Sequence, residues 1–140
     1  MKKPKQRAVD YHSHKVRVGD AGVKGRGVFA REDLKGGEAV EAAPTLVIAR
    51  GDVQMIRSTF LVDYSFGAND DLDLIGLGFV SLYNHSFEPN AFFVLLRHVI
   101  FVRALRPIKA GEEVTFDYGW TDEEFANVGI FREPVSPAQQ

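Results

Sequence analysis

Two apolar runs, Ala91–Leu96 and Val99–Ala104, constrain the fold more than any other feature of this sequence. Both favour extended chain, and only Arg97-His98 separates them, which predicts a β-hairpin. Further short runs of strand-forming residues are bounded by Gly, Asp and Pro, which form turns. These runs are Val16–Val18, Val28–Ala30, Ala39–Glu41, Leu46–Ala49 and Val114–Phe116. The pattern predicts a domain that is mostly β.

Helices are expected to be few and short. Apolar and aromatic residues recur at near-helical spacing within Gly51–Phe66, which predicts one short helix. The apolar segment Leu74–Tyr83 contains two glycines, so it is expected to be either a short helix or closely packed irregular chain. Residues 1–15 read as a loose basic terminus. Residues 120–140 carry an acidic run and further aromatic side chains.

Composition narrows the class of protein. A chain of 140 residues is long enough for one domain with a buried core. The net charge of −2 does not indicate a nucleic-acid binder. The sequence has neither the apolar run of ~18–20 residues that a membrane span needs nor the apolar stretch of a secretory signal. Without cysteine there is no disulfide, thiol nucleophile or cysteine-ligated zinc. His12 and His14 alone are too weak a pattern to predict a metal site.

Three stretches place glycines or polar residues next to predicted strands. Lys24–Ala30 has an Arg between two glycines, which suits either a tight turn or the close approach of a ligand to the backbone. Asn84–Asn90 has two Asn, whose side chains both donate and accept, so it is either a polar loop or a binding segment. Gly111–Gly119 includes Tyr118, which either closes the edge of the core or stands at the mouth of a pocket. Taken singly, none of the three decides between a structural and a functional role.

Together, and in this order and spacing, GRGVFA, YNHSFEPNA and GEEVTFDYG resemble the motifs of the SET-domain family of protein lysine methyltransferases. The resemblance covers roughly residues 14–120 and looks most like the minimal single-domain SET proteins of bacteria and large DNA viruses. It implies a β-clip-like fold of small curved sheets with one or two short helices. It also implies a C-terminal pseudoknot that brings the second and third motifs together. Residues 1–13 would be a flexible tail, and residues 121–140 a tail able to cover the lysine channel.

The resemblance implies roles for individual residues. The cofactor would be S-adenosylmethionine, released as S-adenosylhomocysteine, and no metal would take part. Tyr118 and Tyr64 would be the catalytic residues, Tyr118 as the family's catalytic tyrosine and Tyr64 as an earlier tyrosine that lines the lysine channel. The residues expected to bind the cofactor are Gly25, Arg26, Gly27, Tyr83, Asn84, His85 and Tyr118. The residues expected to line the substrate channel are Tyr64, Phe93, Phe116 and Trp120. The family has Phe or Tyr at position 116, and Phe there usually leaves room for a second or third methyl group.

The expected reaction suits these residue types. Methyl transfer from a sulfonium to an amine is an in-line displacement that requires the neutral amine, whereas free lysine has a pKa of ~10.4. A narrow aromatic channel beside a positive sulfonium lowers that pKa through desolvation and like-charge repulsion. The Tyr118 hydroxyl would hold the methyl and sulfonium groups through weak C–H···O contacts. Positioning can supply ~7–11 kcal/mol in good cases. His85 is expected to be a hydrogen-bonded structural residue rather than a base.

The sequence departs from the family pattern at two places. Many members have Cys after Asn-His-Ser and a Cys-rich segment after the catalytic Tyr, and these cysteines bind zinc. Here Phe87 takes that position and the chain has no Cys, so zinc of that kind is excluded. Trp120, Phe125 and Phe131 are candidates to close the channel instead, or they fill the edge of the core. Ser81 stands where many members have Arg.

Two other classes of protein remain open at this level. One is a catalytically inactive SET-fold module that binds a peptide or the cofactor, and the other is a β-rich structural domain without a ligand. The enzyme's expected partner is a lysine-containing protein or peptide, such as a histone or histone-like protein, with no direct contact to nucleic acid or membrane. A homodimer could complete the peptide groove of so small a domain. Its location would be cytoplasmic in a bacterium and nuclear or chromatin-associated in a eukaryote or virus.

Overall fold

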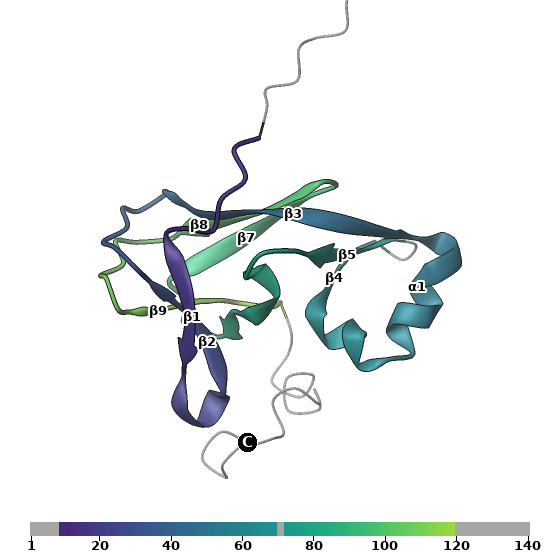
Figure 1. The fold of residues 1–140 in the computed structure, drawn as a ribbon, viewed down its shortest axis with the longest axis horizontal. Helices are drawn as coiled ribbons and strands as arrows, with labels where there is room; N and C mark the ends of the chain where they lie inside the picture. The colour runs from purple at the N-terminus through teal and green to yellow at the C-terminus, as the bar shows by residue number, and fades with distance from the viewer. Residues whose placement is uncertain (1–8, 70–71, 120–140) are drawn as a thin grey trace, which may run out of the picture.

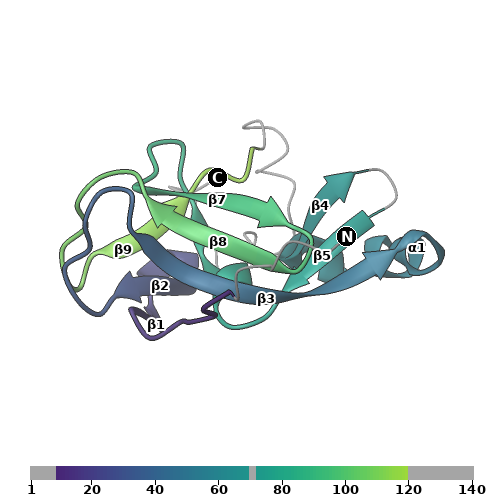
Figure 2. The same cartoon turned by 90° about the horizontal axis from the view of Figure 1, so that it is seen from above.

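The computed structural model describes residues 9–69 and 72–119. In these residues nine strands form two curved sheets, with one α-helix and three 3₁₀ turns, so the prediction of a mostly β domain is confirmed (Figures 1 and 2). The first sheet has the order β1-β2-β9-β6, which are Val16–Asp20, Arg26–Ala30, Glu113–Phe116 and Asn84–His85. The second has the order β4-β5-β3-β8-β7, which are Ser65–Asn69, Leu72–Gly76, Ala39–Ala49, Val99–Ala104 and Ala91–Leu96. The helix α1 is Arg50–Arg57, and the turns η1, η2 and η3 are Gly22–Lys24, Phe60–Tyr64 and Val80–Leu82.

The hairpin of β7 and β8 has the predicted bounds. The two strands pair antiparallel along their whole length, with Leu96 opposite Val99, so Arg97-His98 forms the turn. Every second residue of β8 from Ile100 is buried, which is the pattern of a strand with one face against the core. Local sequence pattern and tertiary packing therefore agree in this part of the chain.

The two strands predicted on either side of Pro44 are one long strand, β3, so the predicted break is wrong. β3 pairs with β8 from Ala39 to Pro44 and with β5 from Thr45 to Ala49. Pro44 thus lies where the partner strand changes, and a missing backbone N–H is tolerated better there than in the middle of one ladder. Figure 1 shows β3 running the length of the second sheet and ending at α1.

Two other segments differ from the predictions. The segment Leu74–Tyr83 does not begin as a helix or as irregular chain, because β5 extends to Gly76 and only Val80–Leu82 forms a helical turn. The helix predicted within Gly51–Phe66 exists as α1 and η2, but the end of that range belongs to the unpredicted strand β4. Pairing with β3 and β4 places Leu74 in the core, which outweighs the strand-weakening effect of Gly76. No helix in the described residues is long and apolar enough to span a membrane.

The N-terminal segment joins the fold earlier than predicted. His12 exchanges backbone hydrogen bonds with Ala42 of β3, at 3.1 and 2.9 Å. The ammonium of Lys15 contacts the carboxylate of Glu38 at 2.9 Å. The loose terminus predicted for residues 1–15 is therefore wrong from His12 onward.

An ion pair holds α1 against the second sheet. The guanidinium of Arg57, the last residue of α1, contacts the carboxylate of Asp73 in β5, with Nη2–Oδ1 at 2.9 Å and Nε–Oδ2 at 3.3 Å. Asp73 is 2% exposed, and a bidentate contact to a buried carboxylate constrains both partners. Because η2 follows α1 almost directly, this pair also helps to set the position of Tyr64.

The parallel pairing of β6 with β9 brings the second and third motifs together, as the resemblance implies, with Asn84 opposite Thr115. The side chain of Asn90 reinforces this short pairing. Its amide nitrogen donates to the carbonyl of Glu113 at 2.8 Å, and its oxygen accepts the backbone N–H of Thr115 at 2.9 Å. An Asn side chain can stand in for a neighbouring strand because it presents a donor and an acceptor side by side.

We predict that Asn90→Ala lowers the free energy of unfolding by about 2–6 kcal/mol, because two polar backbone groups each lose a partner at about 1–3 kcal/mol. Urea denaturation measures the loss. Glu88→Ala, at an exposed position of the same loop, is the control and should stay within about 0.5 kcal/mol of wild type. Equal losses in the two variants would contradict the bridging role of Asn90.

Candidate active site

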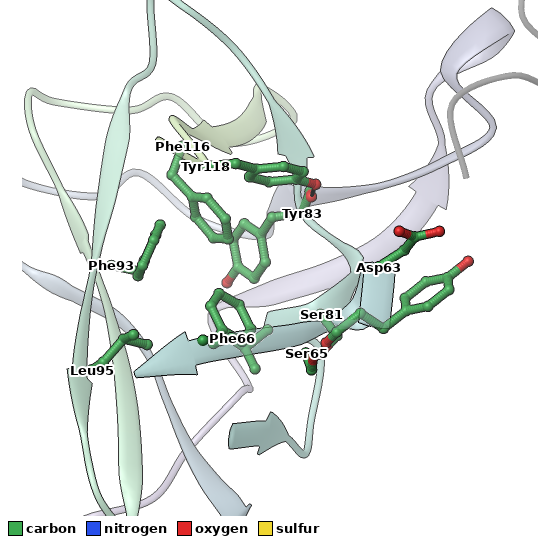
Figure 3. A pocket seen from close by; sticks show the side chains of 12 residues that line it. Asp63, Ser65, Phe66, Ser81, Tyr83, Phe93, Leu95, Phe116 and Tyr118 are labelled. Atoms are coloured by element: carbon green, nitrogen blue, oxygen red, sulfur yellow. Dashed lines mark hydrogen bonds between the residues drawn. The ribbon is translucent and has the colours of Figure 1, made fainter. Parts of the chain in front are cut away.

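A cavity of about 280 Å³ lies where the second sheet meets the end of β9 (Figure 3). Residues from η2, β4, η3, β7 and β9 line it, so segments far apart in the chain surround one space. The lining residues are Asp63, Tyr64, Ser65, Phe66, Gly67, Val80, Ser81, Tyr83, Phe93, Leu95, Phe116 and Tyr118. Its size and its mixture of aromatic and polar groups suit a small ligand or a single long side chain.

Aromatic rings form one wall of the cavity. The ring centre of Phe116 lies 5.0 Å from that of Phe93 and 6.4 Å from that of Phe66, and the rings of Phe66 and Phe93 are 5.3 Å apart. Figure 3 shows these rings, from three different strands, around the same space. Such a wall offers few groups that could replace water around a charge, so it favours the neutral form of an amine.

Tyr118 borders the cavity just beyond β9. Its hydroxyl donates to the backbone carbonyl of Tyr83, and its backbone N–H donates to Nδ1 of His85 at 2.9 Å. Burial raises the pKa of the Tyr118 hydroxyl well above its ordinary value, and the charges of Glu113 and Tyr64 add to this shift. The hydroxyl therefore stays protonated at neutral pH, and because its one proton is donated to Tyr83, its oxygen can accept weak C–H···O contacts but cannot act as a base.

Tyr64 lines the cavity from the end of η2. Its backbone carbonyl accepts a hydrogen bond from the Ser81 hydroxyl at 2.9 Å, and its ring meets that of Phe60 edge-on with centres 6.2 Å apart. Ser81 is one of the two places at which the sequence departs from the family pattern. Here its hydroxyl ties η3 to the segment that carries Tyr64.

The geometry of His85 is that of a structural residue. It is 7% exposed, and its ring packs against Phe87 at 4.2 Å and against Tyr118 at 5.1 Å between ring centres. Because Nδ1 accepts the backbone N–H of Tyr118, His85 fixes the chain on which the cavity tyrosine stands.

Asn84 belongs to a polar cluster in the first sheet. Its amide nitrogen donates to the carbonyl of Arg26 at 3.0 Å and to Oε2 of Glu113 at 2.7 Å. The other carboxylate oxygen of Glu113 contacts the ammonium of Lys24 at 2.5 Å. The cluster thus brings together one negative group, one positive group and the amide of Asn84, a combination that suits a ligand carrying both charges.

Two glycines shape the chain beside this cluster. A Cβ at Gly27 would lie 2.6 Å from Oε2 of Glu113 and 2.9 Å from Nδ2 of Asn84, so only Gly fits there. Gly25 has a φ of +81°, which favours glycine, and the space that its Cβ would occupy is open. Within the predicted Gly25-Arg26-Gly27 stretch, Arg26 and Gly27 therefore meet Asn84 directly.

The predicted site residues fall into two adjoining groups. One lines the cavity and comprises Tyr64, Phe93, Phe116 and Tyr118. The other surrounds the polar cluster and comprises Gly25, Arg26, Gly27 and Asn84. His85 lies between the two groups, next to Tyr118. Trp120, Phe125 and Phe131, expected to close the channel, lie outside the described residues.

Sequence reasoning missed several residues of the site, among them Lys24, Glu113 and the cavity residue Phe66. Glu113 stands inside the GEEVTFDYG motif and Lys24 directly precedes GRGVFA, but their separation in the chain gives no sign that they form a pair. Tyr83, predicted to bind the cofactor, lines the cavity and is 1% exposed; its hydroxyl is held by Glu41, and its backbone carbonyl accepts the hydroxyl of Tyr118. In the part of the chain that the structure describes, no group of three or more His, Asp or Glu residues is arranged to hold a metal ion.

We predict that Tyr118 makes stability depend on pH. Its pKa is raised in the folded chain, so the folded state keeps a proton that the unfolded chain loses near pH ~10. The free energy of unfolding should fall as the pH rises above about 10, and it should fall less steeply in Tyr118→Phe. Urea denaturation on both sides of that pH measures the slopes. Tyr11→Phe, at an exposed tyrosine, should keep the wild-type slope, and the same slope in Tyr118→Phe would refute the assignment.

The sequence of this chain is similar to those of known lysine methyltransferases. The family model of the SET domain matches residues 25–119. The Schizosaccharomyces pombe histone-lysine N-methyltransferase specific for H3 lysine-37 is 29% identical over 115 residues, which are 78% of this chain and 78% of the yeast protein. Human histone-lysine N-methyltransferase 2B is 30% identical over 125 residues, which are 80% of this chain but 4% of the human protein.

A solved structure also has a fold similar to that of this chain. A Plasmodium falciparum protein described as a candidate histone methyltransferase superposes with a TM-score of 0.64 and 29% identity, over 78% of this chain and 96% of that chain. The match to the family model covers all three motifs and both groups of site residues. This chain therefore belongs to the SET-domain family of lysine methyltransferases.

Proposed function

We propose that this protein transfers methyl groups from S-adenosylmethionine to the side-chain amine of lysine in a protein substrate. The observation that carries the proposal is the juxtaposition of two different environments across the β6–β9 pairing. An aromatic cavity bordered by the neutral hydroxyl of Tyr118 adjoins a polar cluster centred on Asn84. Methyl transfer needs both environments, one for a charged cofactor and one for an uncharged amine.

The polar cluster fits the amino-acid end of the cofactor. That end carries an ammonium and a carboxylate, and the cluster offers the Glu113 carboxylate, the Asn84 amide oxygen and the Lys24 ammonium. The open space beside Gly25 lets a ligand approach the backbone closely. When bound, S-adenosylmethionine supplies an activated methyl group on a sulfonium sulfur. We assign Gly25, Gly27 and Asn84 to its binding.

The aromatic cavity favours the neutral, nucleophilic form of the lysine amine. Free lysine is protonated at neutral pH, with a pKa of ~10.4, and only its neutral form is nucleophilic. The rings of Phe66, Phe93 and Phe116 desolvate a side chain that enters between them, which favours the neutral amine. Tyr118, held by Tyr83 and His85, presents its hydroxyl at a fixed place where it can orient the reacting groups. No side chain is assigned as a strong base, and the proton leaves to water.

Histones are the first substrates to test. The yeast and human relatives are named for methylating histone lysine. A histone tail is a lysine-rich, extended segment, and a single lysine side chain is of the size that the cavity accommodates. We propose a histone, or another basic protein with an exposed lysine, as the substrate.

We predict that Tyr118→Phe lowers methyl transfer by roughly 10²–10³-fold, an effect of the size seen when one preorganised active-site hydrogen-bonding group is removed. The assay combines radiolabelled S-adenosylmethionine with a panel of histones and a lysate of the host. Tyr11→Phe is the control, since Tyr11 is 45% exposed and lies outside the site. Binding of S-adenosylhomocysteine without any transfer of label by the wild type would instead favour an inactive SET-fold binding module.

Gly27→Ala should weaken the binding of S-adenosylhomocysteine at least tenfold, because its Cβ would push Glu113 and Asn84 apart. Isothermal titration calorimetry measures the affinity. The matched control is Gly36→Ala, where a Cβ would meet no atom closer than 3.6 Å. Wild-type affinity in a folded Gly27→Ala protein would show that the cofactor does not bind at this cluster.

Phe116→Tyr should shift the product toward monomethyl-lysine, because a hydroxyl added to the cavity wall occupies space that a second or third methyl group needs. Mass spectrometry of a peptide substrate counts the methyl groups. Phe92→Tyr, at an exposed position of β7, is the control. An unchanged product distribution would mean that Phe116 does not limit the number of methyl groups.

A further inference from the structure

Glu41 in β3 is a carboxylate buried inside the core. It is 0% exposed and lies behind the cavity, outside the set of residues that line it. A carboxylate removed from water must be compensated by hydrogen-bond donors, and removing those donors is costly. The contacts of Glu41 therefore show which parts of the fold it joins.

Three donors converge on Glu41, one from the N-terminal segment and two from the ends of η3. Its Oε2 accepts the hydroxyl of Ser13 at 2.6 Å and the backbone N–H of Phe79 at 2.8 Å. Its Oε1 accepts the hydroxyl of Tyr83 at 2.9 Å. Burial raises the pKa of the Glu41 carboxyl, and these three hydrogen bonds oppose that shift. In all three hydrogen bonds Glu41 is the acceptor, which is the pattern expected of an ionised carboxylate.

The turn that supplies one of these donors is shaped for the carboxylate. Gly78 has a φ of +68°, and a Cβ there would lie 2.6 Å from Oε2 of Glu41 and 2.8 Å from Oγ of Ser13. Any larger residue would therefore displace the carboxylate. Glycine at position 78 therefore lets the chain before η3 pack directly against Glu41.

Tyr83 connects Glu41 to the site. Its ring stacks on Phe116, with centres 5.0 Å apart and an interplanar angle of 24°. Its hydroxyl is held by Glu41, and its backbone carbonyl accepts the hydroxyl of Tyr118. One residue thus carries a hydrogen bond to the buried carboxylate at one end and a hydrogen bond to the cavity tyrosine at the other.

We propose that Glu41 is a positioning residue for Tyr118. By fixing the phenol of Tyr83, it fixes the orientation of the Tyr83 backbone carbonyl, and that carbonyl orients the Tyr118 hydroxyl in the cavity. Glu41 itself touches neither the cavity nor the polar cluster. The kinetic consequence rests on the proposed function, whereas the geometric coupling between Glu41 and Tyr118 does not.

The test uses two variants that keep the core filled. In Glu41→Gln, the amide oxygen can keep the Ser13 and Phe79 donors, so the amide nitrogen faces the Tyr83 hydroxyl and removes its acceptor. Tyr83→Phe deletes the hydroxyl and leaves the ring on Phe116. Glu38→Gln is the matched carboxylate-to-amide control, because Glu38 pairs with Lys15 away from the cavity.

The first measurement is independent of turnover. The protein is labelled with tyrosine carrying ¹³C at Cζ, whose NMR shift reports the hydrogen bond of each hydroxyl, and the signals are assigned with single Tyr→Phe variants. We expect the Tyr118 signal to move in Glu41→Gln and in Tyr83→Phe, and to stay in place in Glu38→Gln. The exposed Tyr11 is the internal reference. If Glu41→Gln does not fold, Tyr83→Phe decides the question alone.

The second measurement is steady-state methyl transfer. We expect kcat to fall roughly tenfold in both variants with KM for the lysine substrate nearly unchanged, the size of effect that loss of one hydrogen bond produces. A Tyr118 signal that stays at its wild-type position in the folded variants overturns the proposal, whatever the activity. Absence of turnover in wild type would count against the proposed function, and the NMR result would still decide the role of Glu41.

Discussion

The parallel pairing of β6 with β9 is the contact on which the rest of the structure depends. It is only two residues long, and a parallel pair of that length is weak without help. The help comes from side chains, since Asn90 bridges two backbone groups of β9 and His85 accepts the N–H of Tyr118. These contacts close a loop of about 30 residues, which costs chain entropy that local pairing alone would not offset. The motif residues thus hold the fold together and build the site at the same time.

The core and the cavity share their walls. Phe116 is 1% exposed, stacks on the buried ring of Tyr83 and also lines the cavity. Behind this layer lies Glu41, a buried carboxyl group whose three donors come from the N-terminal segment and from the two ends of η3. The proposed positioning role accounts for this buried carboxyl, because a fixed Tyr118 requires a rigid layer behind it. Changes in this layer are therefore expected to affect stability and activity together.

Part of the fold and part of the candidate site could be predicted from the sequence. The β7–β8 hairpin follows from local patterns, since Arg97-His98 separates two runs of strand formers. The strand β6 could not be predicted in this way, because two residues have no periodicity and their partner is supplied by tertiary contact. Pro44 suggested a break, although it lies where β3 changes partner. The roles of Lys24 and Glu113 were missed because opposite charges 89 positions apart do not reveal a pair. The motif resemblance succeeded because it records tertiary contacts that local patterns omit.

The central claim is that the polar cluster and the aromatic cavity are the two halves of one methyl-transfer site. A crystal structure with S-adenosylhomocysteine and a lysine-containing histone peptide tests it most directly. The account predicts the amino-acid end of the cofactor beside Asn84 and Gly25, and the lysine side chain between Phe93 and Phe116 with its amine toward Tyr118. A peptide bound elsewhere on the domain, or a cofactor bound away from Asn84, would contradict it.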